Sequence, residues 1–306
     1  MTKVLVATDK PFAKNAVDGI KSIILDAGFE FMLLENYPNQ SNFIEAAKEA
    51  DAIIVRSDIA DRELLTAAEN LKIIVRAGAG YDNIDLITAS EKNIVVMNTP
   101  GQNSNAVAEL VLGMMVYIAR NNFDGSSGTE LYGKSIGLHA YGNVSKNVAR
   151  IAKGFGMNVY AYDPYVEKQL IEDSGIITVK TLDELYNKCQ YISLHIPANQ
   201  ETKKSINLEL LSLMPKGATL VNTARKEVIN EDDLLKMFNE RPDFRYIADV
   251  EPDCKKSIID NFKGRYYFTP KKLGAQTSEA NNNAGLAAAR QIVNFIKNSD
   301  TTYKVN

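Results

Sequence analysis

The sequence contains few of the side chains from which metal centres and disulfides are built. Among its 306 residues are only two cysteines, Cys189 and Cys254, and two histidines, His139 and His195. The cysteines lie far apart in the chain and lack the spacing of metal ligands. We therefore expect no metal site and two reduced thiols.

A long hydrophobic run and an excess of positive charge are also missing. The longest apolar stretch, 107–119, is too short to span a bilayer and is interrupted by Glu109. The N-terminus enters a strand-like run directly, without the apolar core of a signal peptide. A formal net charge of −3 argues against nucleic acid as the main partner. We expect a cytoplasmic protein that binds neither membrane nor nucleic acid.

Short apolar runs alternate with helical patterns along the chain. Strand-like runs at 3–7, 31–34, 52–55, 71–76 and 95–97 alternate with helical patterns at 17–27, 43–50 and 62–68. An apolar helix at 106–120 and a polar link at 121–128 follow. The alternation then resumes, with strands at 135–140, 158–162, 191–195, 219–222 and 246–250 and helices at 144–155, 182–188 and 279–297. This βαβα order predicts an α/β fold with mostly parallel sheets covered by helices.

Residues 128–135, Gly-Thr-Glu-Leu-Tyr-Gly-Lys-Ser, match the Walker A pattern. A phosphate-binding loop of that type follows a strand and opens a helix. Here a polar link precedes the match and a strand-like run follows it, so we interpret the segment as a turn feeding a strand. A true P-loop would bind ATP and lose that binding in Lys134→Ala.

A second candidate phosphate site follows at 140–145, Ala-Tyr-Gly-Asn-Val-Ser, between a strand and a helix. Aligned on G-x-G-x-x-G, its three key positions are Ala140, Gly142 and Ser145, so glycine remains only where the backbone meets the pyrophosphate. Ala140 is tolerable if its φ is negative. The Ser145 hydroxyl could bond phosphate. An ordinary βαβ crossover is the alternative interpretation.

Asp163 ends the next strand about twenty residues after this turn, where an acidic side chain accepts hydrogen bonds from the adenosine ribose. The residues after it, Pro-Tyr-Val, offer no cation for a 2′-phosphate. The strand, the helix and Asp163 together predict a dinucleotide site that prefers NAD to NADP.

Nine short segments along the chain have an order and spacing that match those of a known family. They are Val-Arg-Ser at 55–57, Arg-Ala-Gly-Ala-Gly-Tyr-Asp-Asn-Ile-Asp at 76–85, Asn-Thr-Pro-Gly at 98–101, Ala-Val-Ala-Glu at 106–109, Leu-Tyr-Gly-Lys at 131–134, Ser-Leu-His-Ile-Pro at 193–197, Asn-Thr-Ala-Arg at 222–225, Asp-Val-Glu-Pro at 249–252 and Thr-Pro at 269–270. Jointly they resemble the D-2-hydroxyacid dehydrogenases, and within that family the short phosphoglycerate-oxidising branch without a regulatory domain.

This resemblance implies two doubly wound parallel-sheet domains. A flavodoxin-like substrate domain would contain 1–98 and 282–306, and a Rossmann-like NAD-binding domain would contain 99–281. Relatives are commonly dimers, so a homodimer is expected. The residues expected to bind NAD are Tyr141, Gly142, Asn143, Val144, Asp163, His195, Thr223, Ala224 and Asp249.

Oxidising an alcohol next to a carboxylate needs a base for the hydroxyl proton, a cation for the carboxylate and a nicotinamide for the hydride. Arg225 follows a strand, and a guanidinium can hold a carboxylate with two hydrogen bonds. The family motif places its catalytic arginine at this position. The alternative is a surface arginine near Glu227.

The family's acid/base is a histidine after Thr-Pro, paired with a glutamate, and this chain has no histidine there. The position falls on Lys272, with Lys271 the next candidate and Glu251 the expected partner. A lysine in a closed, dry cleft can have its pKa lowered toward neutrality, while Glu251 limits that shift. The alternatives are that both lysines are solvated charges on a loop, or that the protein has lost catalysis.

His195 is the rival base, although the resemblance places its segment beside the cofactor. His139 is interpreted as a core histidine.

Two arginines and a glycine turn indicate a phosphorylated substrate. Arg56 and Ser57 follow one strand, and Arg76 leads Gly78 and Ala79, whose amides could hold an anion. The alternative is that Arg56 and Arg76 are capped charges on the protein surface. The expected reaction is oxidation of 3-phosphoglycerate to 3-phosphohydroxypyruvate with NAD, in serine biosynthesis. The rivals are another D-2-hydroxyacid dehydrogenase, a glyoxylate or hydroxypyruvate reductase, and a catalytically silent NAD-binding sensor or scaffold.

Overall fold

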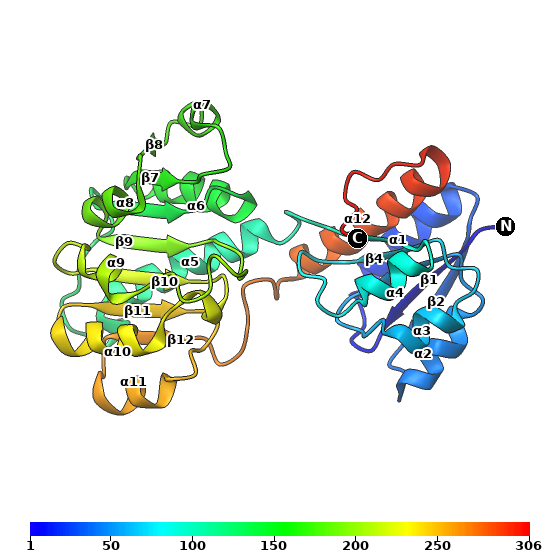
Figure 1. The fold of residues 1–306 in the computed structure, drawn as a ribbon, viewed down its shortest axis with the longest axis horizontal. Coiled ribbons are helices and arrows are strands. Elements are labelled where there is room, and N and C mark those ends of the chain that lie inside the picture. Colours follow the sequence, from blue (N-terminus) through cyan, green and yellow to red (C-terminus); the bar gives the residue numbers. More distant parts are fainter. The chain divides into compact units, whose positions relative to one another are not determined.

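The computed structural model describes residues 1–306, which form two compact units (Figure 1). The first unit contains Met1–Asn103 and Gln276–Asn306, and the second contains Ser104–Ala275. The expected limits, 98/99 and 281/282, lie five residues before and six residues after the observed ones. The later limit was misplaced because it cuts the helix Ser278–Asn298, which packs as one body in the first unit.

The first unit is a five-stranded parallel sheet in the order β2-β1-β3-β4-β5. Its strands are β1 (Lys3–Thr8), β2 (Glu30–Glu35), β3 (Ala52–Val55), β4 (Ile73–Arg76) and β5 (Val95–Asn98). Its helices are α1 (Lys14–Asp26), α2 (Gln40–Ala47), α3 (Arg62–Ala67), α4 (Leu86–Glu91) and α12 (Ser278–Asn298). The strand order reverses between β1 and β3, where doubly wound sheets bind ligands at their carboxyl ends.

The second unit is a seven-stranded parallel sheet in the order β12-β11-β10-β9-β6-β7-β8. Its strands are β6 (Ser135–His139), β7 (Asn158–Tyr162), β8 (Ile177–Thr178), β9 (Tyr191–Leu194), β10 (Thr219–Asn222), β11 (Arg245–Ala248) and β12 (Tyr266–Phe268). Its helices are α5 (Ser104–Ala119), η1 (Asn121–Phe123), α6 (Asn143–Gly154), α7 (Lys168–Glu172), α8 (Leu182–Lys188), α9 (Leu208–Ser212), η2 (Lys226–Val228), α10 (Glu231–Glu240) and α11 (Lys255–Asn261). Two doubly wound parallel sheets confirm the predicted fold class.

Helices cover both faces of each sheet (Figure 1). In the first unit, Val4 and Val6 face α1 and α12, while Leu5 and Ala7 face α2, α3 and α4. In the second unit, α5 and α6 pack on one face and α8, α9 and α10 on the other. Strands buried on both faces have continuous apolar sequences, which explains why the apolar runs predicted them. None of the helices is long and apolar enough to cross a membrane.

The Walker A match leads into a strand, as expected. Residues 128–134 form coil and a turn, and β6 begins at Ser135. No helix follows whose first amides could hold phosphates. Lys134 instead donates a hydrogen bond to the carbonyl of Glu130.

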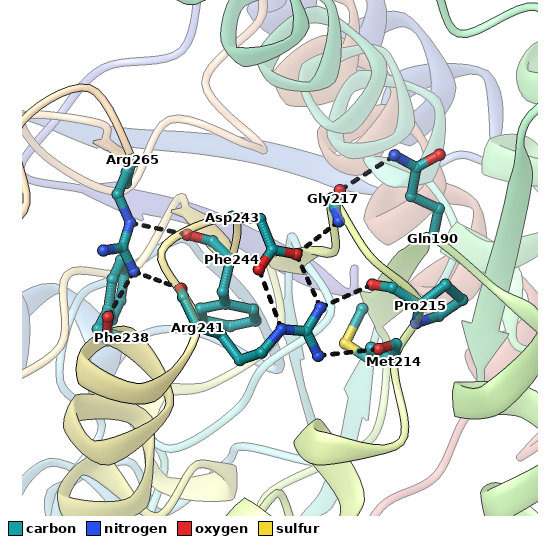
Figure 2. A network of polar contacts seen from close by, with 9 residues as sticks. All are labelled: Gln190, Met214, Pro215, Gly217, Phe238, Arg241, Asp243, Phe244 and Arg265. Atoms are coloured by element: carbon teal, nitrogen blue, oxygen red, sulfur yellow. Dashed lines mark hydrogen bonds and ion pairs between the residues drawn. The ribbon is translucent and has the colours of Figure 1, made fainter.

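A polar network joins the amino ends of β9, β10, β11 and β12 (Figure 2). Arg241 donates to both carboxylate oxygens of Asp243 at 3.0 and 2.7 Å, and to the carbonyls of Met214 and Pro215. The amide of Gly217 also donates to Asp243, at 2.6 Å. This network lies at the strand ends opposite to those that carry the predicted site residues.

Candidate active site

Every site residue predicted in the second unit follows or ends a strand at the carboxyl edge of the sheet. The turn 140–145 follows β6, Asp163 follows β7, His195 follows β9 and Arg225 follows β10. Asp249 and Glu251 follow β11, and the two lysines follow β12. The strand order reverses between β6 and β9, and that switch point is where doubly wound sheets hold dinucleotides.

The start of α6 is open to an anionic ligand. Gly142 is the N-cap residue, no side chain caps the helix, and the first helical hydrogen bond runs from the Lys146 amide to the Gly142 carbonyl. A Cβ built on Gly142 would meet no atom within 4 Å. Uncapped amides and a helix dipole bind phosphate groups. These features fit the pyrophosphate of NAD.

Ala140 and Ser145, the two motif positions that lack glycine, are joined by a hydrogen bond in the turn. Ala140 has a φ of +83°, so the condition of a negative φ, under which alanine was expected to be tolerable here, is not met. The Ser145 hydroxyl is buried and donates to the Ala140 carbonyl at 2.6 Å, so it stabilises the turn. Its contact with phosphate stays a prediction. The hydroxyl bond holds alanine in a left-handed conformation that glycine adopts without cost.

Asp163 ties the ends of β6 and β7 together. One carboxylate oxygen accepts the Tyr141 amide at 2.7 Å, and the other accepts the amides of Tyr165 and Val166 at 2.8 and 3.2 Å. A carboxylate has about four acceptor sites, so these bonds leave capacity for a ribose hydroxyl. The ribose contact stays a prediction.

His139 is buried and His195 is half-buried, and both have a lowered pKa. Nε2 of His195 lies 2.9 Å from the Ser193 hydroxyl, and burial, followed by the neighbouring His139, lowers the pKa of His195 to about 3. Nδ1 of His139 lies 3.2 Å from the Tyr186 hydroxyl, and burial lowers the pKa of His139 to about 4. The core interpretation of His139 is confirmed. A base is most effective with a pKa near the working pH, so His195 is a poor candidate.

The loop after β10 is fixed by Asn222, a fully buried residue for which no role was predicted. Its amide nitrogen donates to the Arg225 carbonyl at 3.0 Å, and its oxygen accepts the Ala224 amide at 2.9 Å. Arg225 forms no ion pair with Glu227 or any other acid, and its guanidinium donates only to the Ala224 carbonyl. Four of its five N–H groups therefore remain for a substrate carboxylate.

One buried hydroxyl without a hydrogen-bond partner favours binding of a polar ligand at the carboxyl edge of the second sheet. The Thr223 side chain is buried, yet its oxygen has no hydrogen-bond partner. Buried polar groups are normally paired. An unpaired hydroxyl at the carboxyl end of β10, one strand from the switch point, fits a cofactor or substrate that supplies the missing partner.

The lysines lie on the loop after β12. Both Lys271 and Lys272 are exposed, whereas dry surroundings were expected for a lysine base. Glu251 forms an ion pair with Lys255, four residues further along the chain. The pairing of Glu251 with Lys272 stays a prediction.

In the first unit, Arg56 is held by backbone carbonyls. Its Nη1 donates to Lys10 and Pro11 at 2.8 and 3.1 Å, its Nη2 donates to Asn281 at 2.8 Å, and its guanidinium lies over the Phe12 ring. These bonds favour the structural alternative for Arg56. Its contact with substrate stays a prediction, as does that of the exposed Ser57.

Gly78 makes room for Arg76. A Cβ on Gly78 would lie 1.3 Å from Nη1 of Arg76, and its φ of +153° is rare for other residues. Nε of Arg76 donates to the Arg56 carbonyl at 3.0 Å, and the Ala79 carbonyl accepts from Asn98 at 2.7 Å. Arg56, Arg76 and the glycine turn therefore meet at the carboxyl edge of β3 and β4.

Asp58 and Asn83 support this edge and were missed as site residues. Asp58 accepts the Asp9 amide and the Tyr37 hydroxyl, and Asn83 donates to the Asp58 carbonyl at 2.6 Å. Asn83 belongs to the segment 76–85, one of those that carry the family resemblance, and Asp58 directly follows the segment 55–57. Their positions in or directly after these segments could have identified them from the sequence.

Comparison with known proteins identifies relatives along the whole chain. The model of the D-isomer specific 2-hydroxyacid dehydrogenase NAD binding domain matches residues 107–260. D-3-phosphoglycerate dehydrogenases of Methanocaldococcus jannaschii and Homo sapiens are 37% and 31% identical over 84% and 94% of this chain, and 52% and 56% of their own lengths. The chain thus spans about half the length of these curated relatives.

Two other relatives have nearly the same length as this chain. Hydroxypyruvate reductase of Thermotoga maritima is 33% identical over 95% of this chain and 98% of its own. The crystal structure of NAD+-bound 3-phosphoglycerate dehydrogenase from Entamoeba histolytica has 47% sequence identity and a TM-score of 0.87, and covers 100% of this chain and 98% of that chain.

Proposed function

Because the chain belongs to the D-isomer specific 2-hydroxyacid dehydrogenase family, we propose that it oxidises 3-phosphoglycerate to 3-phosphohydroxypyruvate with NAD, as the first step of serine biosynthesis. The observation that carries the proposal is the chemistry of one sheet edge. There, the uncapped start of α6, the unpaired Thr223 hydroxyl, Arg225 and the lysine loop follow strands of the same sheet.

NAD, when bound, supplies the acceptor for the hydride that leaves C2 of the substrate. The amides at the start of α6 bind its pyrophosphate, and Asp163 its ribose. Arg225 holds the substrate carboxylate with paired N–H groups. Lys272, in its neutral form, takes the proton from the C2 hydroxyl as the carbonyl forms, and Glu251 stabilises the resulting ammonium. His195, with its pKa lowered to about 3, stays neutral nearby.

For the first unit, taken by itself, we propose a phosphate-binding site. Arg76 and the amides of Gly78 and Ala79 provide the anion-binding groups, with Arg56 and Ser57 beside them. We further propose a cytoplasmic location, since the curated relatives are metabolic enzymes of the same family. The homodimer expected from the family resemblance is also a proposal. Hydroxypyruvate reduction is the second candidate function, favoured by the likeness to the Thermotoga maritima enzyme over nearly its whole length.

The test compares the parent with Lys272→Ala and its matched control Lys271→Ala. With 3-phosphoglycerate and NAD, we expect Lys272→Ala to lower kcat by about 100-fold or more, the contribution of a general base, and Lys271→Ala to retain most activity. The reverse order would assign the base to Lys271. A parent that binds NAD but turns over no 2-hydroxy acid would favour a silent sensor or scaffold and refute the proposal.

A further inference from the structure

The carboxylate of Asp249, at the end of β11, holds both ends of the lysine loop. Oδ1 accepts the Thr269 hydroxyl at 2.9 Å and the Leu273 amide at 2.6 Å, and Oδ2 accepts the Gly274 amide at 2.8 Å. Asp249 is only 2% exposed and Thr269 is fully buried. Thr269 begins the loop and Leu273 and Gly274 end it, so one carboxylate closes the segment that carries Lys271 and Lys272.

The approach of the loop to Asp249 is close enough to require glycine. A Cβ on Gly274 would lie 2.8 Å from Oδ2 of Asp249 and 3.2 Å from Cγ2 of Val107. The Thr269 hydroxyl also reaches the backbone carbonyl of Asp249 at 3.0 Å. The loop is therefore packed as well as hydrogen-bonded at this point.

The same strand ends hold the arginine loop. The Asp249 amide donates to the Asn222 carbonyl at 3.0 Å. The Asn222 side chain in turn bonds the Ala224 amide and the Arg225 carbonyl. Asn222 and Asp249, at the ends of the adjacent strands β10 and β11, thus hold the loops of Arg225 and Lys272 at the same edge of the sheet.

We propose that Asp249 and Thr269 form a clamp, here called the Asp249 clamp, that positions the lysine loop for proton transfer. The clamp is a positioning device and adds to the cofactor contact expected of Asp249. Its catalytic consequence rests on the proposed function, because the base must meet the hydroxyl of a substrate whose carboxylate Arg225 holds. Such transfers tolerate little displacement, and a shift of 1 Å can reduce the rate by about 100-fold.

Three variants test the clamp. Asp249→Asn keeps the shape but replaces one acceptor oxygen by an NH2 group, which cannot accept the Leu273 or Gly274 amide. Thr269→Val removes the hydroxyl at constant shape, and Thr269→Ser keeps it. The matched control is Asp243→Asn, which removes a carboxylate with a similar set of donors at the opposite ends of the strands.

The first readout is amide hydrogen exchange in 269–274, which needs no activity. We expect exchange to rise by about tenfold or more in Asp249→Asn and Thr269→Val, because a lost charge-assisted bond exposes these amides. Thr269→Ser and Asp243→Asn should exchange like the parent. If Asp249→Asn does not fold, the two Thr269 variants decide the question. If Asp249→Asn and Thr269→Val both exchange like the parent, the proposed clamp is refuted.

The second readout separates kcat from KM. We expect Asp249→Asn to lower kcat by about 100-fold, whether or not loss of the expected cofactor contact also raises KM for NAD. Thr269→Ser should restore the activity lost in Thr269→Val. A raised KM for NAD with an unchanged kcat would make Asp249 a cofactor ligand and overturn the positioning role. A parent that fails with 3-phosphoglycerate refutes the proposed function alone, since loop exchange still decides the clamp.

Discussion

Replacing Asp243 by asparagine removes the charge at the centre of the network in Figure 2. The parent carboxylate accepts two N–H groups of Arg241 and the Gly217 amide, all within 3.0 Å. Asparagine keeps one acceptor and faces the remaining donors with an NH2 group. Arg241 keeps its bonds to the carbonyls of Met214 and Pro215, so the network weakens without leaving the guanidinium unpaired.

The loss of stability follows from these contacts. Hydrogen bonds to charged groups contribute about 1.5–3 kcal/mol each. The Asp243 side chain is 27% exposed, so solvent screening reduces this value, and we expect a total loss of about 2 kcal/mol. For a unit of this size, such a loss lowers Tm by about 4–8 °C.

The pH dependence of this loss has a defined sign. The Arg241 guanidinium, helped by the Gly217 amide, holds the pKa of Asp243 well below its usual range. A depressed carboxyl pKa stabilises the folded state above the unfolded pKa of about 3.9, and this stability is lost as pH falls through the folded pKa. The difference between parent and variant should therefore be constant from neutral pH to about pH 5 and shrink in stronger acid.

The assay is urea unfolding followed by circular dichroism at a series of pH values, with thermal unfolding as a check. Parent and Asp243→Asn should differ in midpoint at neutral pH and converge in acid. Equal midpoints at neutral pH, or a gap that persists in acid, would refute the reasoning. The kcat of the variant should match the parent, since Asp243 lies away from the proposed site.

Two further predictions concern strain and thiol reactivity. Ala140→Gly should raise the free energy of unfolding by about 0.5–1 kcal/mol, because relief of the left-handed φ exceeds the entropy that glycine adds to the unfolded chain; a less stable variant in urea unfolding would contradict this. Burial raises the pKa of the Cys189 and Cys254 thiols to about 12, so iodoacetamide at pH 8 should label the native protein slowly and the urea-unfolded protein fast. Rapid native labelling, read by mass spectrometry, would show that either thiol is more accessible than its burial indicates.

The fold was predictable because buried parallel strands leave a strong pattern. Runs such as Ala-Ile-Ile-Val at 52–55 are apolar at every position, since both faces of β3 are covered. The strands β8 and β12 were missed, as they lie at the sheet edges and contain only two and three residues. Such short edge strands have too few residues to show a pattern.

Site residues at strand ends were predicted by type and position, whereas their contacts were not. The φ of Ala140 depends on the turn that the Ser145 hydroxyl closes, and no sequence pattern reports that bond. The Asp249 clamp joins groups twenty or more residues apart in the chain. Contacts of this kind arise only when neighbouring strands bring their ends together.

The most direct measurement of the proposed reaction is the ratio of kcat/KM for 3-phosphoglycerate to kcat/KM for D-glycerate, which differ only in the phosphate. If Arg76 and the glycine turn bind that phosphate, charged hydrogen bonds should favour 3-phosphoglycerate by about 100-fold. A ratio near one, or a preference for D-glycerate or hydroxypyruvate, would contradict the proposed substrate and favour the reductase function.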